Sequence, residues 1–161
     1  MRPTAIDDAE FICTLMNIPK WIQYIGDRNV RTSGDAKNYI LNRMTPQLER
    51  LGYSNYTVIR KTDRAKIGTC GLHDREGLNG IDLGFAFLPE YEGKGYGFES
   101  AQRMVRAAKE QFNLNYLSAI TVRENLASQK LLEKLGFEFS KTIRLGETEL
   151  LLFKIILNGR P

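Results

Sequence analysis

The chain has 161 residues, which is enough for one domain, residues 1–161, to bury a core without a metal or a disulfide. The formal charge of +4 comes from 23 Lys and Arg against 19 Asp and Glu spread along the chain, so we expect a small polyanionic ligand rather than nucleic acid. No apolar run approaches the roughly 20 residues of a membrane span, no signal peptide is evident, and Cys13 and Cys70 lie far apart, so we expect a cytoplasmic protein with free thiols and no membrane partner.

The N-terminal third predicts two helices. Residues 7–16 place acidic side chains before apolar positions at helical spacing, and Pro19 is expected to end this helix. Residues 32–48 form a second helical pattern, which we expect to bend at Pro46. The connection at residues 21–28 is loop-like and carries the single Trp of the chain. Three cations of the second helix are expected to be only solvated: Lys37, Arg43 and Arg50.

The period of the apolar residues then changes to two. Residues 56–60 and 66–72 alternate on either side of the polar turn 61–64, which predicts a β-hairpin. A turn rich in Gly and charge leads into a further strand at residues 81–88, which Pro89 closes. These segments predict a meander of antiparallel strands.

A glycine-rich loop after that strand is the most informative part of the sequence. The loop precedes a helical pattern at residues 98–112 and consists of Gly93, Lys94, Gly95, Tyr96 and Gly97. A strand, a glycine-rich turn and a helix start present unpaired amides at the positive end of a helix dipole, which suits a phosphate. The spacing fits neither a P-loop nor a dinucleotide fingerprint, so a plain tight turn is the alternative for these residues alone.

The C-terminal part predicts a strand, a helix and two more strands. The strand at residues 116–122 leads to a helix that Asn125 is placed to cap and Gly136 is placed to end. Strands at 137–143 and 147–156 complete the chain. We therefore predict an α/β fold with a mixed, mainly antiparallel central sheet of about six to seven strands flanked by helices.

Two motifs together resemble the GNAT superfamily of acetyl-CoA-dependent N-acetyltransferases. The first is the segment 88–97 with its glycine loop, and the second joins Asn125-Leu-Ala-Ser128 to Leu135-Gly136-Phe137. The likeness is closest to the RimJ/RimL branch, which acetylates the N-termini of ribosomal proteins, and it extends over residues 7–156.

The chain departs from the family pattern at two places. Glu92 stands where the family usually has Gln or Arg, and we expect its side chain to point to solvent because an inward carboxylate would repel a pyrophosphate. Family members begin with a strand, for which only residues 1–6 are available here. That strand is expected to be short or partly missing.

The resemblance implies acetyl-CoA as cosubstrate and no metal. The amides from Gly93 to Phe98 would hold the pyrophosphate, with Lys94 either adding a point charge or only solvated. The strand edge at Phe87 and Leu88 would pair with the pantetheine arm. Asn125 would bind the same arm or act only as a helix cap.

Direct attack of an amine on the thioester implies a base and an acid. Asp82 and His73, which the hairpin would bring together across the strands, are the candidate bases. The alternatives are a strand Asp that only accepts hydrogen bonds and an exposed His at a turn. Leu132 occupies the position of the Tyr acid found in many members, which excludes a Tyr acid there. In the RimJ/RimL branch a Ser three residues after the Asn serves near the sulfur, so the resemblance implies Ser128 as the candidate that protonates the thiolate, unless it only bonds to backbone.

The acceptor implied by the resemblance is a primary amine, either a protein N-terminus or a small molecule. Trp21 and Asp27 either form its pocket or pack the first helices against the sheet. An active N-acetyltransferase is the favoured function, the alternative is a CoA-binding regulatory domain without turnover, and an RNA- or ribosome-associated module is a weaker third. The oligomeric state expected is a monomer or a homodimer.

Overall fold

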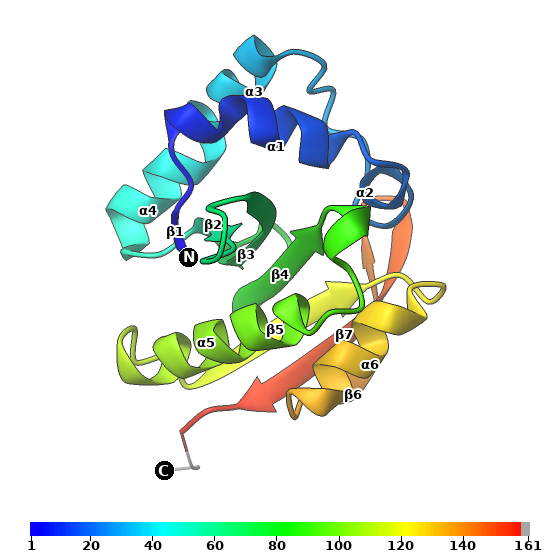
Figure 1. Cartoon of the computed structure of the whole chain (residues 1–161). Helices are drawn as coiled ribbons and strands as arrows, with labels where there is room; N and C mark the ends of the chain where they lie inside the picture. Colours follow the sequence, from blue (N-terminus) through cyan, green and yellow to red (C-terminus); the bar gives the residue numbers. More distant parts are fainter. Residues whose placement is uncertain (159–161) are drawn as a thin grey trace.

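The computed structural model describes residues 1–158, and residues 159–161 of the expected domain lie outside the described range. Seven strands form one sheet in the order β1-β2-β3-β4-β5-β7-β6 (Figure 1). The neighbours β4 and β5 run parallel and the other neighbours antiparallel. The strands are β1 (Arg2–Pro3), β2 (Asn55–Ile59), β3 (Lys66–Asp74), β4 (Ile81–Phe87), β5 (Tyr116–Thr121), β6 (Glu138–Leu145) and β7 (Thr148–Ile156). The predicted mixed, mainly antiparallel sheet is confirmed, and its first strand is indeed short.

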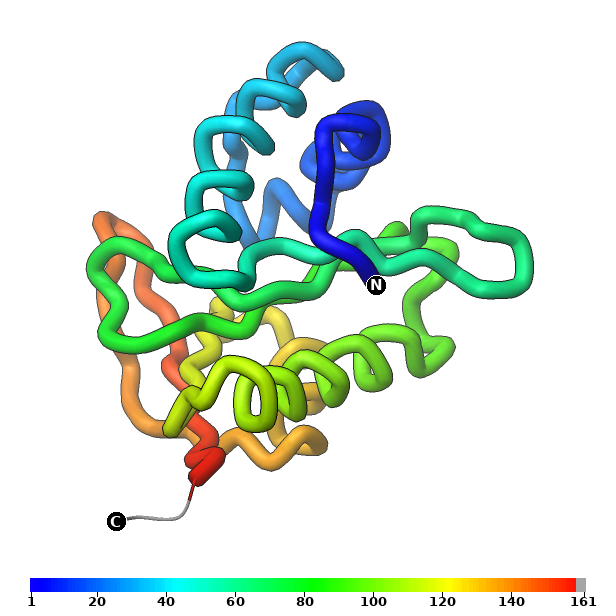
Figure 2. Tube along the Cα trace, turned by 90° about the vertical axis from the view of Figure 1, so that its left-hand side faces the viewer, coloured from blue at the N-terminus to red at the C-terminus, as the bar shows by residue number. Residues whose placement is uncertain are grey.

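Helices cover both faces of the sheet. Figures 1 and 2 show α1, α3 and α4 on one side and α5 and α6 on the other. The helices are α1 (Ala9–Met16), α2 (Pro19–Tyr24), α3 (Ser33–Tyr39), α4 (Thr45–Leu51), α5 (Tyr96–Glu110) and α6 (Leu126–Lys134). A π-helical segment, Ile40–Met44, joins α3 to α4, and short 3-10 turns lie at Ile6–Asp8 and Pro89–Tyr91.

The face toward α5 carries the main hydrophobic core. Leu72 and Leu83 lie opposite each other on β3 and β4 and are buried in one cluster with Met104 of α5. Side chains of a strand alternate between its faces, so the apolar set of β4 ends at Phe87 on this same side. The helical stripe predicted for α5 is therefore core.

The opposite face of the central strands carries polar residues and residues with small side chains. Asp82, Gly84 and Ala86 alternate with the core residues of β4, and His73 lies directly across from Asp82 on β3. The predicted register of the hairpin is confirmed. This face lies toward the N-terminal helices, so a polar molecule bound there would not have to enter the hydrophobic core.

A buried carboxylate ties the N-terminus to this polar face. Asp8 has no exposed surface, and Arg2 donates to its two oxygens at 2.7 and 2.8 Å. Lys66 Nζ lies 2.8 Å from Oδ1, and the Thr57 hydroxyl donates to Oδ2 at 3.0 Å. Burial alone would raise the pKa of Asp8, but the hydrogen bonds from Arg2 and Lys66 outweigh burial and hold that pKa well below its usual range.

Replacing Asp8 by Asn is expected to lower the free energy of unfolding by about 3 kcal/mol, because two cations lose their buried partner. Urea denaturation at pH 7 measures this loss. The depressed pKa makes the ionised carboxylate stabilising above the ordinary Asp pKa of about 4, and this contribution is lost as the pH falls further. The difference between variant and wild type should therefore shrink in acid. Asp7→Asn, at an exposed neighbour, is the control and should change stability by less than about 0.5 kcal/mol.

Pro19 begins a helix rather than only ending one. The first helix stops at Met16, and Pro19 is the first residue of α2, where its missing N–H removes no helical hydrogen bond. The segment expected to be a loop, residues 21–28, therefore starts inside α2. Trp21 packs against the small core that α1, α3 and the π segment share. The apolar residues of α2 are too few to give a helical period, which explains the error.

The bend in the second predicted helix begins before Pro46. Thr32 caps α3 and forms a capping box with Asp35, as its sequence predicts. The helix then widens into the π segment and tightens again at α4, with Pro46 in the first turn of α4. Proline cannot donate to the carbonyl four residues earlier, and the wider turn accommodates that missing bond.

Candidate active site

The glycine loop offers a run of unused hydrogen-bond donors. Within residues 1–158, none of the amides from Gly93 to Phe98 donates to another group of the chain, and the first bond of α5 runs from the Glu99 amide to the Gly95 carbonyl. Gly95 is the N-cap and has no side chain to bond these amides. Its φ of 86° is in the left-handed region, which other residues adopt only with strain. The loop can therefore receive an anion at the positive end of α5.

Charged side chains surround the loop without filling it. Arg60 and Lys94 stand over the Tyr91 ring, with the guanidinium carbon at 5.0 Å and the Lys94 Nζ at 6.0 Å from the ring centroid. Glu92 is exposed, as expected, and forms an ion pair with Lys20 of α2. The departure at Glu92 therefore leaves the amide-lined side of the loop free of negative charge. Lys94 forms no ion pair within residues 1–158, whereas Arg60 is already paired with Asp63.

The remaining predicted loop residues start α5. Tyr96 is the first residue of the helix, which begins before the predicted start at Phe98. A Cβ at Gly97 would lie 3.6 Å from the Phe87 ring, so Gly97 packs α5 closely onto the end of β4. Lys134 of α6 stands over the Phe98 ring at 4.3 Å from its centroid. This contact brings the start of α5 next to the end of α6.

The two parallel strands meet at one point and then part. Asp82 pairs with Ser118, and no later residue of β4 pairs with β5 in the described chain. The β4 edge from Gly84 to Leu88 therefore faces β5 without ladder hydrogen bonds. Phe87 and Leu88 lie at the end of this open edge, just before the glycine loop. An extended chain with its own amides can pair with such an edge.

The second motif lies at the start of α6. The Asn125 side chain accepts a hydrogen bond from the Ser128 amide at 3.2 Å, which confirms the predicted cap. The Ser128 hydroxyl has no hydrogen bond to another described residue and is partly exposed. Leu132, which replaces the family's Tyr, is buried in the core one turn further on. The Ser128 hydroxyl is thus free to donate a hydrogen bond to a ligand at the start of α6.

The candidate bases lie side by side on the polar face. Asp82 is 1% exposed, and Arg75 donates to its Oδ2 from Nε at 3.1 Å and from Nη2 at 2.9 Å. Its other oxygen, Oδ1, is buried and accepts no hydrogen bond within residues 1–158. The His73 ring lies over Gly84, where an added Cβ would come within 3.1 Å of Cδ2. His73 is therefore not the exposed turn residue of the alternative interpretation.

Burial shifts the pKa of Asp82 and the pKa of His73 in opposite directions. Burial raises the pKa of Asp82 to about 6, and the attraction of Arg75 only partly opposes this. Burial and the positive charge of Arg75 lower the pKa of His73 to about 4. At neutral pH Asp82 is therefore mostly ionised and His73 is neutral.

Helix α4 fixes the strand end that carries His73. Gln47 Nε2 donates to the Leu72 carbonyl at 2.7 Å, and Gln47 Oε1 accepts from the Asp74 amide at 3.0 Å. Arg50 forms an ion pair with Asp74 at 2.7 Å. The expectation that Arg50 is only solvated is therefore wrong. Backbone on both sides of His73 is locked to one helix.

The acceptor side predicted around Trp21 is only partly formed. Trp21 packs among the first helices, but the cluster that it joins contains no residue of the sheet, so the structural interpretation is met only in part. Its buried Nε1 has no partner among residues 1–158. Asp27 is bound by Arg31, with Nη1 at 2.9 Å from Oδ1, and it also accepts from the Asn29 amide. A carboxylate held in this way is not free to receive an amine.

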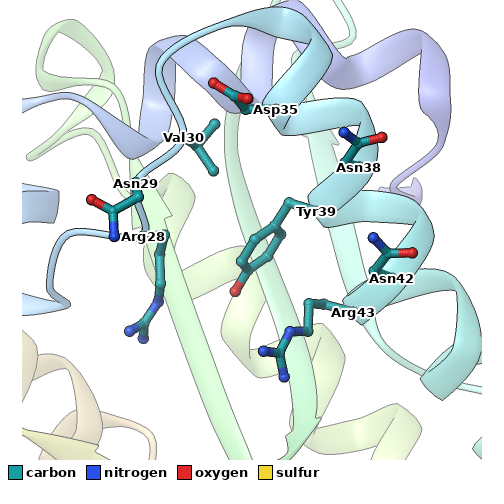
Figure 3. A pocket seen from close by; sticks show the side chains of 8 residues that line it. All are labelled: Arg28, Asn29, Val30, Asp35, Asn38, Tyr39, Asn42 and Arg43. Atoms are coloured by element: carbon teal, nitrogen blue, oxygen red, sulfur yellow. The ribbon is translucent and has the colours of Figure 1, made fainter.

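A pocket of about 270 Å³ lies beside this segment, between the α2–α3 connection and the helix that runs from α3 into the π segment. Figure 3 shows the guanidinium groups of Arg28 and Arg43 and the Tyr39 hydroxyl pointing the same way, with Asp35 on the opposite rim. The pocket is lined by Arg28, Asn29, Val30, Asp35, Asn38, Tyr39, Asn42 and Arg43. Arg43 is exposed and forms no ion pair within residues 1–158, as expected for a solvated cation, and it also lines this pocket.

Sequence reasoning missed Arg75 and Gln47. A signal existed for Arg75, since a buried strand carboxylate needs a counter-charge and Arg75 is the single cation of the turn between β3 and β4. No sequence signal pointed to Gln47. Its contacts depend on how α4 lies against the sheet, which periodicity does not define.

The open strand edge and the amide-lined loop agree with the family that the two motifs resemble, and comparisons with known proteins identify that family. The chain belongs to the GNAT acetyltransferase family, because the family model described as "Acetyltransferase (GNAT) domain" matches residues 1–138. The family predicted from the two motifs is thereby confirmed.

Individual relatives support the same family and fold. The protein named "Uncharacterized N-acetyltransferase p20" from Bacillus licheniformis is 27% identical over 146 residues, which cover 89% of this chain and 81% of p20. Ribosomal-protein-S5-alanine acetyltransferase from Vibrio fischeri shares the fold with a TM-score of 0.83 at 20% identity, covering 99% and 94% of the two chains. RimL, the ribosomal L7/L12 alpha-N-protein acetyltransferase solved with coenzyme A, also gives 0.83, at 14% identity, covering 97% and 92%.

Residues 1–158 contain neither a membrane-spanning helix nor a metal-binding cluster. Among residues 1–158, no helix combines the length and apolar character needed to cross a bilayer. The same residues contain no group of three or more His, Cys, Asp or Glu placed to hold a metal ion.

Proposed function

We propose that this family member transfers the acetyl group of acetyl-CoA to a primary amine, by direct attack of the amine on the thioester. The observation that carries the proposal is that the amides from Gly93 to Phe98 donate no hydrogen bond within residues 1–158. They lie just after the edge of β4 that does not pair with β5. Relatives support the donor, since one solved neighbour is described with coenzyme A and another, yncA from Salmonella typhimurium, with acetyl-CoA.

Three parts of the site would hold acetyl-CoA. The loop amides would bind the pyrophosphate, with Lys94 adding positive charge. The open edge at Phe87 and Leu88 would pair with the pantetheine amides. Asn125 would contact the arm through its amide nitrogen, because its oxygen already caps α6.

Asp82 is the better of the two bases. An attacking α-amine has a pKa near 8, so passing its proton to Asp82, of pKa about 6, is uphill by about 3 kcal/mol. Passing it to His73, of pKa about 4, is uphill by about 5 kcal/mol. The unpartnered Oδ1 of Asp82 also gives the proton a place to go. His73 then serves as a neutral neighbour that holds a water or the amine by hydrogen bonding.

The acceptor that demands least of this base is an α-amine. At pH 7 an amine of pKa near 8 costs about 1.4 kcal/mol to neutralise, against about 4.6 kcal/mol for a Lys side chain of pKa near 10.4. A protein N-terminus or a small amine of low pKa is therefore the proposed acceptor. Two solved neighbours bear the names of ribosomal-protein acetyltransferases, which favours the RimJ/RimL branch.

Ser128 is proposed to donate its hydroxyl proton toward the departing thiolate. Ser128→Ala is expected to lower kcat by about tenfold, the effect of one weak acid, while the KM for acetyl-CoA rises by less. Steady-state kinetics at saturating acceptor measure both values. Ser140→Ala, at an exposed position of β6, is the control and should change neither. A larger change in KM than in kcat would show that Ser128 only binds the donor.

Two measurements test the function as a whole. Acetyl-CoA at 100 times its Kd should stabilise the protein by about 2.7 kcal/mol in thermal unfolding. Thiol release from acetyl-CoA should then accelerate with peptide or small-molecule amines. Stabilisation without thiol release for any amine would instead make the protein a CoA-binding regulatory domain. Absence of stabilisation would overturn the assignment of the glycine loop.

A further inference from the structure

Positive charge without a partner gathers in the pocket between the α2–α3 connection and the π segment. Within residues 1–158, neither Arg28 nor Arg43 forms an ion pair, whereas the neighbouring Arg31 is neutralised by Asp27. Figure 3 shows both guanidinium groups and the Tyr39 hydroxyl pointing the same way from the walls of this pocket. Two unpaired cations and a hydroxyl on one side of a pocket can bind an anionic group.

The one carboxylate of the pocket is occupied elsewhere. Asp35 Oδ2 accepts hydrogen bonds from the backbone amides of Arg31 and Thr32, each at 2.9 Å. These bonds hold its carboxylate at the start of α3, on the rim away from the two guanidinium groups (Figure 3). The side of the pocket that carries the two guanidinium groups is therefore positive.

The pocket lies on the acceptor side of the candidate active site. Arg43 is the last residue of the pocket wall along the helix, and Gln47 follows it by four residues, within α4. Gln47 contacts the backbone on both sides of His73. The pocket wall at Arg43 is thus about one helical turn, or about 6 Å, from a residue that touches the strand of His73.

This spacing sets where the anion would sit relative to the amine. One turn of helix, the reach of the Gln47 side chain to β3 and the single spacing of about 4.8 Å from β3 to β4 place Arg43 on the order of 10 to 15 Å from Asp82. The α-carboxylate of a free amino acid lies too close to its own amine to reach across such a span. An extended peptide advances about 3.3 Å per residue, so an acidic side chain at the third or fourth position can do so.

We infer that the acceptor is a peptide N-terminus with Asp or Glu at its third or fourth residue, bound by Arg28, Tyr39 and Arg43. This inference rests on the proposed acetyl transfer and names its substrate class. Arg43 lies in the π segment Ile40–Met44, and such segments are frequent at functional sites. The same charges would repel a peptide with Lys at those positions.

The test compares three peptides that differ at two residues. Each begins with Ala and carries Glu, Gln or Lys at positions three and four, and acetyl transfer is followed by thiol release. For the wild type, kcat/KM for the Glu peptide should exceed that for the Gln peptide by about tenfold, the effect of one good charged hydrogen bond, mostly through KM. Free glutamate should be a poor acceptor.

Variants assign the preference to the pocket. Arg28→Gln and Arg43→Gln should each reduce the ratio of kcat/KM for the Glu peptide to that for the Gln peptide, and the double variant should bring this ratio close to one. Lys37→Gln removes an exposed charge of the same helix outside the pocket and should leave the ratio unchanged. Charge reversal, Arg28→Glu with Arg43→Glu, should make the Lys peptide the best acceptor.

The outcomes separate this inference from the proposed function. Equal acetylation of all three peptides by the wild type overturns the acidic acceptor and leaves acetyl transfer intact. A better reaction with free glutamate than with the Glu peptide overturns the peptide class. Failure to acetylate any amine, although acetyl-CoA still stabilises the protein, overturns the proposed function and this inference with it.

Discussion

Asp82→Asn is expected to lower kcat by about 10² to 10⁴, the range for loss of a positioned general base. The amide keeps an oxygen that can accept from Arg75, so the variant should retain the local packing of β4. The wild-type profile of kcat/KM should rise as the pH passes through about 6, because the carboxylate must ionise before it can accept a proton. The variant should lose this rise in kcat/KM near pH 6. It should keep the second rise near pH 8, where the acceptor amine loses its proton.

Stability measurements separate this catalytic role from a structural one. The pKa of Asp82 is raised in the fold, so its contribution to stability is present below its ordinary pKa of about 4 and is lost as the pH rises through about 6. At pH 8 the Asn variant lacks a buried charge and should be no less stable than the wild type. Asp74→Asn, at the exposed end of β3, should keep near-normal kcat. An Asp82→Asn enzyme of unchanged kcat would return the role of base to His73 or to water.

Gly95→Val is expected to raise the KM for acetyl-CoA by about a hundredfold, because about two charge-assisted hydrogen bonds to phosphate would be lost. Gly95 has φ 86° and ψ −5°, which a β-branched residue does not adopt without strain. No atom lies within 4 Å of the added Cβ, so the strain comes from the backbone and not from a clash. Relaxation of this strain would turn the amides of the loop away from the ligand.

Gly52→Val is the matched control for this change. Gly52 ends α4 with φ 79° and ψ 0° and also has no atom within 4 Å of an added Cβ. The two variants should lose similar stability in thermal unfolding without ligand. Only Gly95→Val should lose the stabilisation by acetyl-CoA. Equal loss of that stabilisation in both variants would mean that strain in general, and not the loop, controls donor binding.

The sequence predicted most elements because each had a strong local signal. The period of two in residues 56–60 and 66–72 gave the hairpin, and Asn125 with Gly136 gave the limits of α6. The glycine loop was placed correctly at the N-terminus of α5. The opposition of His73 and Asp82 followed from the hairpin register, since facing residues of an antiparallel pair share one side.

What the sequence did not predict depends on contacts between distant elements. Helix α2 was missed because its stability comes from Trp21 in a shared core, and six residues show no clear period. The anchoring of Asp82 by Arg75 and of β3 by Gln47 requires the relative positions of separate elements. The pocket around Arg28 and Arg43 likewise joins a loop to a helix. Charged residues on a helix look alike in sequence whether they face solvent or one another.

The single pairing between β4 and β5 makes the donor a structural part of the protein as well as a reactant. Without acetyl-CoA, the backbone amides along the β5 side of β4 can hydrogen-bond only to water. We therefore expect these amide hydrogens to exchange quickly with deuterated solvent. Hydrogen bonds from the pantetheine arm to this edge of β4 would slow that exchange. Before acetyl-CoA binds, one side of the amine site is incomplete, so we expect the two substrates to bind in a fixed order, acetyl-CoA before the amine.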